Sequence, residues 1–230
     1  MRAMILAAGK GERMRPLTEQ IPKPLLSVAD KPLIEHQLER LIDAGFSEFV
    51  INVSWLGQQI IDYLGDGRGR GVRIQYSIEE TPLETAGGVV KALPLLGSKP
   101  FLLVNSDIWS DFDFRQILSL EVGARRGHLV LVANPVHHPR GDFDLRESLV
   151  EIGGATTYTY SGIGVYHPGF FAGYDAEPLP MRPLLDRAIS EKRLSGSLFD
   201  GTWLDIGTPG RLRELNERLE KHAQQNESSL

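Results

Sequence analysis

A short apolar run near the start of the chain, residues 3–8, is long enough for one buried strand, and it stops at Gly9-Lys10-Gly11. Apolar residues then recur at helical spacing over residues 33–42, and a second apolar run follows at residues 49–53. A strand, a helix and a strand of these lengths form a βαβ unit, whose two strands run parallel. This unit predicts an α/β fold built on a parallel sheet.

The same alternation continues to the end of the chain. Strands are predicted over residues 72–77, 101–105, 128–133, 149–152, 156–166 and 201–207. Helical patterns cover residues 60–64, 89–96, 114–120, 184–194 and 211–221, and residues 134–146 are predicted to form a loop. No internal repeat or Pro/Ser-rich linker interrupts the pattern, so we expect one domain over residues 1–222. The polar residues 223–230 are expected to form a frayed tail.

Composition and charge exclude several classes of protein. The 230 residues include no cysteine and carry a formal net charge of −5. Disulfides, thiolate metal sites and cysteine nucleophiles are therefore excluded, and a broad nucleic-acid-binding surface is not expected. No apolar run approaches the roughly 20 residues of a membrane span, and the first run is shorter than a signal-peptide core of roughly 7–15 residues. We expect a cytoplasmic protein without nucleic-acid or membrane partners.

The glycine-containing loop after the first strand suits a polyphosphate. Backbone N–H groups at glycines can approach phosphate oxygens closely, and Arg13, Arg15 and Lys23 follow in the same loop. Two other glycine motifs do not fit, because Met14 replaces the third glycine of a dinucleotide fingerprint and Met4 replaces the first glycine of a P-loop. The alternative is an ordinary turn with solvated basic residues. Prolines on both sides of Lys23 restrict its backbone and favour a lysine held against a fixed target.

The whole loop resembles the signature of the sugar-1-phosphate nucleotidyltransferases. The matching residues are Leu6-Ala7-Ala8-Gly9-x-Gly11-x-Arg13-Met14-x-Pro16-Leu17-Thr18 and Pro22-Lys23-Pro24-Leu25. Members of this family join a nucleoside triphosphate to a sugar 1-phosphate and release pyrophosphate. The resemblance extends over about residues 3–212. It implies the family's nucleotide-diphospho-sugar transferase fold, a single-domain, Rossmann-like, three-layer α/β structure with a mixed, mostly parallel sheet.

The resemblance also implies roles for residues of the loop, which we call the signature loop. The nucleotide would lie along Ala8, Gly9, Gly11 and Glu12. Arg13 would clamp the leaving pyrophosphate, and Lys23 would bind the α-phosphate region and stabilise its charge, so these two are the expected catalytic residues. The sugar phosphate oxygen would attack the α-phosphorus in line, without a covalent enzyme intermediate.

The segment Leu83-Glu84-Thr85-Ala86-Gly87-Gly88 precedes the helical pattern at residues 89–96. Taken alone, it suits an ordinary helix N-terminus with a capping residue. A similar segment reads the base in this family, so the resemblance makes Thr85 and Gly88 base-site candidates, together with Glu79 upstream. Hydrogen bonds from a loop to a base edge suit a pyrimidine, and we expect UTP to be preferred over dTTP and GTP.

Two aspartates are the candidate metal ligands. Asp107 follows the most apolar predicted strand, and ligands of open α/β sheets gather at such strand ends. The resemblance implies a metal-binding aspartate at this position. Asp205 lies in Trp203-Leu204-Asp205-Ile206-Gly207-Thr208-Pro209, which resembles the family's second metal-binding segment. Either aspartate could instead cap a turn. Mg²⁺ binds through one or two carboxylates plus substrate phosphates, so it is the expected cofactor.

The sugar side is less well defined by the sequence. Asn105, Asp142, Glu151 and Gly162 are the candidates for contacts with the sugar phosphate substrate. Many family members have a lysine for the sugar phosphate just before the sugar-site strand, but Glu151-Ile152-Gly153-Gly154 contains none. The cation that binds the sugar phosphate is therefore unassigned. His137 and His138 are expected to be surface residues.

Within the family, the loop motifs and the short length most resemble the uridylyltransferases that act on N-acetylmuramate 1-phosphate in cell-wall recycling. The implied reaction joins UTP and N-acetyl-α-muramate 1-phosphate to give UDP-N-acetylmuramate and pyrophosphate, with a monomeric enzyme. One alternative is transfer to glucose or mannose 1-phosphate from UTP, dTTP or GTP. Another is a catalytically silent, nucleotide-sensing regulator on the same fold. The sequence leaves the sugar, the number of metal ions and the oligomeric state open.

Overall fold

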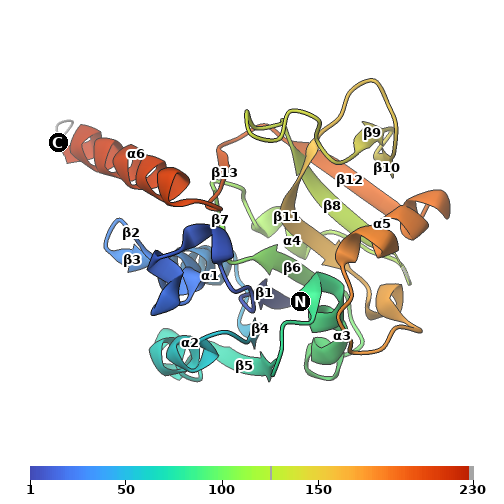
Figure 1. Cartoon of the computed structure of the whole chain (residues 1–230). Helices are drawn as coiled ribbons and strands as arrows, with labels where there is room; N and C mark the ends of the chain where they lie inside the picture. The colour runs from blue at the N-terminus through green and yellow to red at the C-terminus, as the bar shows by residue number, and fades with distance from the viewer. Residues whose placement is uncertain (125, 228–230) are drawn as a thin grey trace.

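The computed structural model describes residues 1–124 and 126–227 of the chain. A nine-stranded sheet runs through the molecule in the order β5-β4-β1-β6-β11-β8-β12-β10-β9 (Figure 1). Its strands are β1 (Arg2–Leu6), β4 (Glu48–Val53), β5 (Arg73–Ile78), β6 (Phe101–Asn105), β8 (Gly127–Val132), β9 (Asp144–Arg146), β10 (Leu149–Glu151), β11 (Thr159–Tyr166) and β12 (Leu194–Phe199). Two small sheets pair β2 (Ser27–Val28) with β3 (Lys31–Pro32) and β7 (Ile108–Ser110) with β13 (Trp203–Asp205).

Parallel pairing dominates one half of the large sheet. Strands β5, β4, β1 and β6 are parallel neighbours, and β12 is parallel to β8. Strand β11 is antiparallel to both β6 and β8, and β10 is antiparallel to β12 and β9. The pairing of β1 with β4 across a helix confirms the predicted βαβ unit. The sheet is mixed and mostly parallel at the half that carries the signature loop.

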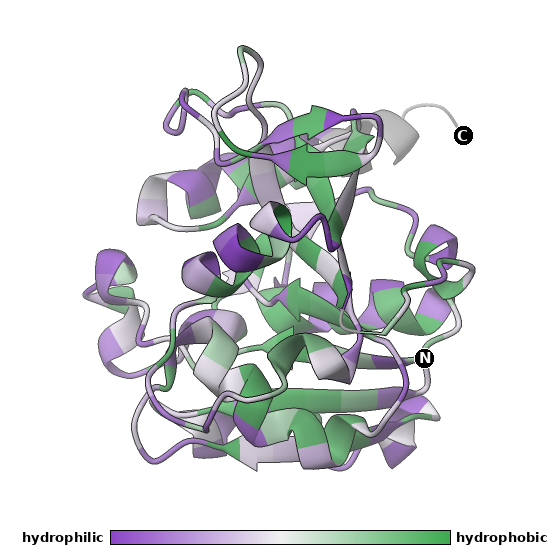
Figure 2. Ribbon diagram, turned by 90° about the vertical axis from the view of Figure 1, so that its right-hand side faces the viewer, coloured by the Kyte–Doolittle hydropathy of each residue, from purple (hydrophilic) through white to green (hydrophobic). Residues whose placement is uncertain are grey.

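Helices cover both faces of this sheet and make three layers. They are α1 (Leu33–Asp43), α2 (Gly57–Leu64), α3 (Glu84–Leu96), α4 (Arg115–Leu118), α5 (Met181–Ser190) and α6 (Pro209–Glu227). Buried side chains of α1, α2 and α4 join one core cluster, and those of α3 and α5 join another. Figure 2 shows hydrophobic strands between these helical layers. None of the described helices is long and apolar enough to cross a membrane.

A third, smaller core cluster lies under the signature loop. Met14 of the loop packs there with Leu26, Val28, Leu33 and Ile206, and with Leu215 of α6. Figure 1 shows α6 lying against this part of the molecule, while its C-terminal end points away from the body. The last long helix of the chain therefore supports the loop at the start of the chain.

Several predicted boundaries were wrong. Helix α3 begins at Glu84, so the base-site candidates Thr85 and Gly88 lie inside its first turns and do not precede it. Helix α5 ends at Ser190, and a short turn then leads into β12 at Leu194, a strand that the sequence did not predict. Ser195, Gly196 and Ser197 have low strand propensity, and their pairing with β8 overrides it.

Two further segments differ from the expectations. Strand β9 lies inside the predicted loop at residues 134–146 and pairs with β10 at the edge of the sheet. Helix α6 continues through Glu227, so no helix end marks the predicted boundary between residues 222 and 223. The end of the predicted tail, residues 228–230, lies outside the described residues.

Candidate active site

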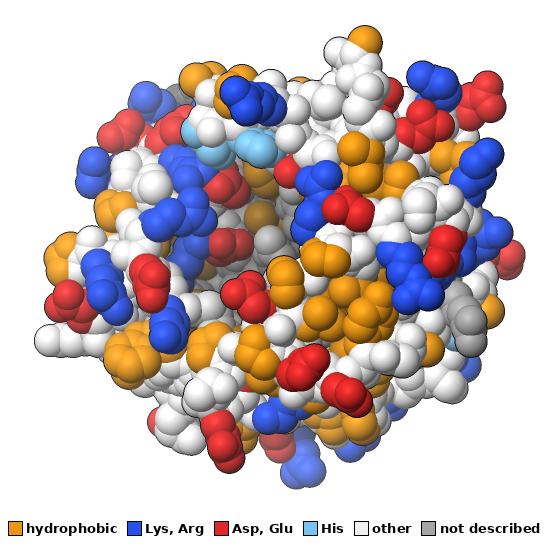
Figure 3. Space-filling view, turned by 45° about the vertical axis from the view of Figure 1, so that its right-hand side comes forward, with side chains coloured by type: hydrophobic (Ala, Val, Ile, Leu, Met, Phe, Trp, Pro, Cys, Tyr) orange, Lys and Arg blue, Asp and Glu red, His pale blue; other side chains and the backbone are white. Residues whose placement is uncertain are grey.

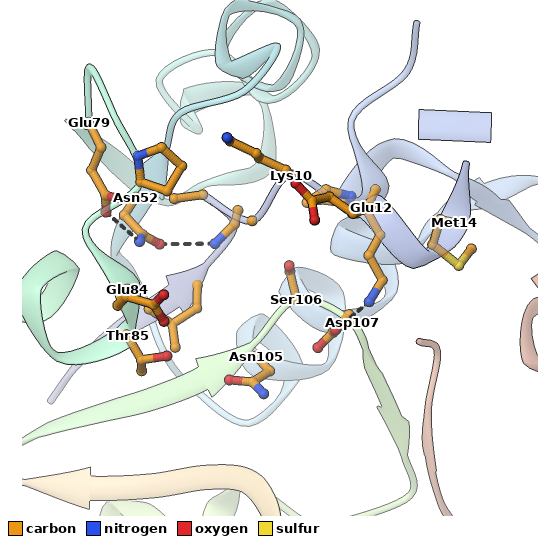
Figure 4. A pocket seen from close by; sticks show the side chains of 18 of the residues that line it. Lys10, Glu12, Met14, Asn52, Glu79, Glu84, Thr85, Asn105, Ser106 and Asp107 are labelled. Carbon is orange, nitrogen blue, oxygen red and sulfur yellow. Dashed lines mark hydrogen bonds and ion pairs between the residues drawn. The ribbon is translucent and has the colours of Figure 1, made fainter. Parts of the chain in front are cut away.

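A pocket of about 970 Å³ opens at the carboxyl ends of β1, β4 and β6. Because these strands are parallel neighbours, their final residues meet at one edge of the sheet. The predicted residues among those lining it are Ala8, Gly9, Gly11, Glu12, Arg13, Lys23, Glu79, Thr85, Asn105 and Asp107. Residues separated by most of the first half of the chain are thus brought together. Figure 4 shows several of these side chains around the pocket.

The signature loop folds back on itself through Gly11. This residue has φ +63°, and a Cβ there would lie 2.9 Å from Cγ2 of Thr18 and 3.2 Å from Cβ of Lys23. The hydroxyl of Thr18 donates to the Gly11 carbonyl over 2.8 Å. Trp55 donates from its indole nitrogen to the Thr18 carbonyl over 3.2 Å, which connects the turn between β4 and α2 to the loop. Glycine at position 11 therefore permits the close packing that brings Lys23 to the pocket.

Lys23 and Asp107 form an ion pair across the pocket. The lysine Nζ donates to Oδ2 of Asp107. The Lys23 side chain is only 11% exposed, whereas 32% of the Asp107 side chain is accessible. An ammonium group held in this way is largely shielded from solvent and fixed in position. The pairing supports the prediction that Lys23 has a fixed target.

A buried polar network lies beneath the predicted base site. The side-chain carbonyl of Asn52 accepts from the Ala7 N–H over 2.9 Å, and its amide nitrogen donates to Glu79 over 2.8 Å. The other oxygen of Glu79 accepts from the Leu83 N–H over 2.9 Å. The network joins the end of β1 to the start of α3. Both oxygens of Glu79 are therefore engaged within the protein, and Glu79 is 3% exposed.

Gly88 lies against this network and does not line the pocket. A Cβ at Gly88 would lie 2.6 Å from Oε1 of Glu79 and 2.9 Å from Nδ2 of Asn52. Thr85 lines the pocket from the same helix, together with Glu84, whose backbone has a left-handed φ of +61°. Gly88 thus leaves room for the network, while Thr85 and Glu84 are the residues of this segment that a base could contact.

The two predicted metal ligands are neighbours through their backbones. Strands β7 and β13 pair antiparallel with Asp205 opposite Ile108, and the Ile206 N–H donates to the Asp107 carbonyl over 2.7 Å. The Asp205 carboxylate, however, is not among the pocket-lining groups. It accepts from Nη1 of Arg211, and Nε2 of His137 lies 2.9 Å from its Oδ1. Each candidate carboxylate is thus paired with a cation of the chain.

No group of three or more His, Asp or Glu side chains able to hold a metal occurs within the described part of the chain. The two carboxylates nevertheless suit Mg²⁺, which binds through oxygen atoms and commonly completes its coordination with water and substrate phosphates.

The predicted sugar-side residues separate into three groups. Asn105 lines the pocket. Gly162 packs against the Asn105 side chain, because a Cβ at Gly162 would lie 2.7 Å from Nδ2 of Asn105. Asp142 accepts from the Tyr160 N–H over 2.8 Å and lies 3.1 Å from Nε2 of His138. Glu151 lies on β10 and pairs with Arg146 over 3.6 Å, away from the pocket lining. Asn105 and Gly162 are brought together, but Glu151 is not.

His137 and His138 are surface residues, as expected, with side chains 44% and 40% exposed. Both nevertheless contact residues that were predicted to belong to the site. His137 contacts the metal candidate Asp205, and His138 contacts the sugar-site candidate Asp142. Figure 3 shows histidine side chains at the rim of a hollow that also carries acidic and basic groups.

Sequence reasoning missed Asn52, Ser106, Gly207 and Arg211. The first three line the pocket, and Arg211 pairs with Asp205. Asn52 could have been found from the sequence, because it is the polar residue near the end of the apolar run at residues 49–53. Arg211 gave no such signal, because a basic residue near the start of a charged helix is ordinary.

The chain matches the nucleotidyl transferase family over residues 2–142. It belongs to this family. Among curated proteins it is 52% identical over 222 residues to an N-acetylmuramate alpha-1-phosphate uridylyltransferase of Neisseria meningitidis serogroup B, a match that covers 93% of this chain and 96% of the relative. A protein of the same description from Caulobacter vibrioides is 33% identical, with coverage of 90% and 92%.

A solved structure has the same fold as this nucleotidyltransferase. A Bacillus anthracis protein assigned as a glucose-1-phosphate thymidylyltransferase superposes with a TM-score of 0.82 at 20% sequence identity, covering 94% of each chain. At that identity the likeness concerns the fold alone. It agrees with the predicted three-layer α/β architecture.

Proposed function

We propose that this chain transfers the uridylyl group of UTP to N-acetyl-α-muramate 1-phosphate and releases pyrophosphate. The observation that carries the proposal is the 52% identity, over nearly the whole chain, to a uridylyltransferase of this description. The pocket supports it, because the signature loop and the ion pair of Lys23 with Asp107 lie together at the sheet edge where a nucleotide would bind.

The proposed mechanism relies on positioning and charge neutralisation. Lys23 would bind the α-phosphate and stabilise the negative charge that builds up as the sugar phosphate oxygen attacks. Arg13 lines the same pocket and would neutralise the departing pyrophosphate. The attack forms one P–O bond to the sugar phosphate and breaks the bond to the β-phosphate oxygen, so no covalent enzyme intermediate is needed. Thr85 and Glu84 would meet the uracil edge.

Asp107 and Asp205 would hold Mg²⁺ in this mechanism. The bound ion would neutralise and orient the phosphates of both substrates. For Asp107 to serve as a ligand, Lys23 must turn from its carboxylate toward the α-phosphate. The aspartate would then attract the cation while the lysine attracts the anion. Such an exchange of partners would couple nucleotide binding to metal binding.

The test is a turnover panel with the purified chain. UTP and Mg²⁺ are combined separately with the 1-phosphates of N-acetylmuramate, N-acetylglucosamine, glucose and mannose, and pyrophosphate release and product mass are measured. We expect UDP-N-acetylmuramate as the fastest product, and UTP ahead of dTTP and GTP. Faster turnover of glucose or mannose 1-phosphate would support the alternative sugar specificity. No turnover of any pair would favour a nucleotide-sensing regulator.

We further propose that the enzyme acts as a cytoplasmic monomer in cell-wall recycling. The reaction would return a recovered sugar phosphate to the pool of activated precursors. Light scattering after size exclusion tests the oligomeric part of this proposal, with an expected mass near the 25.6 kDa of one chain. A mass twice as large would contradict it.

A further inference from the structure

Arg211 occupies a position that the proposed mechanism leaves without a role. It lies in the first turn of α6, immediately after the segment that contains Asp205. Its Nη1 donates to both oxygens of Asp205, and its Nε lies 3.4 Å from the hydroxyl of Thr208. The side chain is only 16% exposed. The ion pair and the burial together fix the direction of the guanidinium group.

One nitrogen of this guanidinium remains available. Within the described residues, Nη2 of Arg211 donates to no protein atom. It lies directly beside Gly207, since a Cβ at that position would be 2.7 Å from Nη2. Gly207 lines the pocket. Among the described residues, the two N–H groups of Nη2 therefore have no protein acceptor, and they lie behind Gly207, which has no side chain to cover them.

The surroundings of Arg211 belong to the sugar side. The loop between β8 and β9 reaches it through His137, whose Nε2 lies 2.7 Å from Nη1. The next residue, His138, contacts the sugar-site candidate Asp142. The phosphates of the nucleotide have other cations, because Lys23 and Arg13 line the nucleotide side of the pocket. A ligand of Arg211 is thus expected to be an anionic group on the sugar, not on the nucleotide.

N-acetylmuramate carries such a group. It differs from N-acetylglucosamine only by a lactyl ether on O3, which ends in a carboxylate. We propose that Arg211 binds this carboxylate through Nη2 and thereby selects the acidic sugar, an inference that rests on the proposed function. The contact with Asp205 can persist, because Nη1 and Nη2 are separate donors and each carboxylate oxygen of Asp205 has a further lone pair for a metal ion. The positive charge of Arg211 also offsets the negative charge of Asp205, which would otherwise repel the substrate carboxylate.

The test compares two substrates that differ only in the lactyl group. Steady-state kcat/KM is measured for the 1-phosphates of N-acetylmuramate and N-acetylglucosamine in wild type, Arg211→Met and Arg211→Lys. We expect Arg211→Met to lower the preference for the acidic sugar by roughly tenfold or more, the usual effect of losing a charge-assisted hydrogen bond. Arg211→Lys should restore part of it. Arg213→Met, an exposed arginine on the same helix, is the matched control and should leave the preference unchanged.

Calorimetric titration of each sugar 1-phosphate into the nucleotide-free protein gives a second readout. It should show the same selective weakening for the acidic sugar in Arg211→Met. An equal loss of affinity for both sugar 1-phosphates would overturn the inference. It would mean that Arg211 binds the phosphate that both sugars share, or that it only holds Asp205 in place. An unchanged preference would overturn it as well. A wild-type protein that does not use N-acetylmuramate 1-phosphate would instead refute the proposed function itself.

Discussion

Lys23 illustrates how much one side chain depends on its immediate surroundings. The prolines on either side restrict its backbone, and the packing of Gly11 against Thr18 leaves its side chain directed at Asp107. Water reaches 32% of the aspartate side chain, so the pair is accessible to ligands without being fully exposed. At this scale the site contains an ion pair that is partly open to solvent, and in the proposed mechanism Lys23 would exchange its carboxylate partner for a substrate phosphate.

The prediction at the scale of the residue concerns Lys23→Met. We expect kcat to fall on the order of 10²-fold or more, because in the proposed mechanism Lys23 is a fixed donor to the developing charge. Unfolding free energy should change by about 1 kcal/mol or less, since Asp107 can be solvated. Steady-state kinetics and urea denaturation measure the two effects. Lys31→Met, which removes a surface pair with Glu39, is the control, and an equal fall in kcat there would remove the special role of Lys23.

At the scale of the element, β12 depends on its neighbour for its conformation. His128 of β8 lies between Ser195 and Ser197 of β12, with ring nitrogens 2.9 Å and 3.0 Å from the two hydroxyls. This contact crosses the parallel pair that the sequence did not predict. Burial lowers the pKa of His128, because a charged imidazole would lose its hydration there.

The lowered pKa of His128 predicts a pH dependence of stability. The unfolded chain takes up a proton near pH 6.5, while the folded chain does so only at lower pH, so folding stability falls as pH decreases below about 6.5. His128→Gln should remove this component. Urea midpoints from pH 7.5 to pH 5 should decline less in the variant than in wild type. Parallel curves for the two proteins would contradict the prediction.

Helix α6 provides a second prediction at this scale. Leu215 is fully buried in the small core cluster with Met14 of the signature loop. Leu215→Ala should cost about 2–5 kcal/mol by leaving a cavity, and it should also raise the KM for UTP because the loop loses its support. Leu198→Ala, at a residue that is 48% exposed, should change neither by much. Denaturation and kinetics together test whether Leu215 supports UTP binding through the signature loop. A loss of stability with an unchanged KM for UTP would contradict this prediction.

At the scale of the whole molecule, the candidate site joins distant parts of the chain. Its nucleotide side comes from the carboxyl ends of β1, β4 and β6, and its second aspartate comes from β13 near the other end of the chain. Ligands that engage both parts should therefore stabilise the complete fold.

The corresponding prediction concerns ligand-dependent melting. UTP with Mg²⁺ should raise the melting temperature more than UTP with a chelator, because in the proposed mechanism Asp107 and Asp205, from two distant segments, would hold the cation beside the nucleotide. Asp107→Asn should abolish the difference between the two conditions while it keeps most of the folded-state stability. Differential scanning fluorimetry measures all four combinations. A variant that retains the full Mg²⁺-dependent increase would exclude Asp107 from the metal site.

The sequence alone determined the class of fold and, through the signature loop, the family. Both depend on local patterns: apolar runs long enough for buried strands, and a closely spaced set of glycines, prolines and cations. The family was therefore readable from a short segment. The predicted roles of Asp107 and Asp205 in metal binding, and of residues 83–88 in base binding, also came from the sequence, although only through the resemblance.

Only the tertiary structure decided how distant residues combine. Pairing of β7 with β13 brings Asp205 next to Ile108, and pairing with β8 makes a strand of Ser195, Gly196 and Ser197. The structure also separates Glu151 from the pocket and sets the guanidinium of Arg211 behind Gly207. Contacts of this kind depend on the register of strands far apart in the chain, and local propensity carries no information about that register.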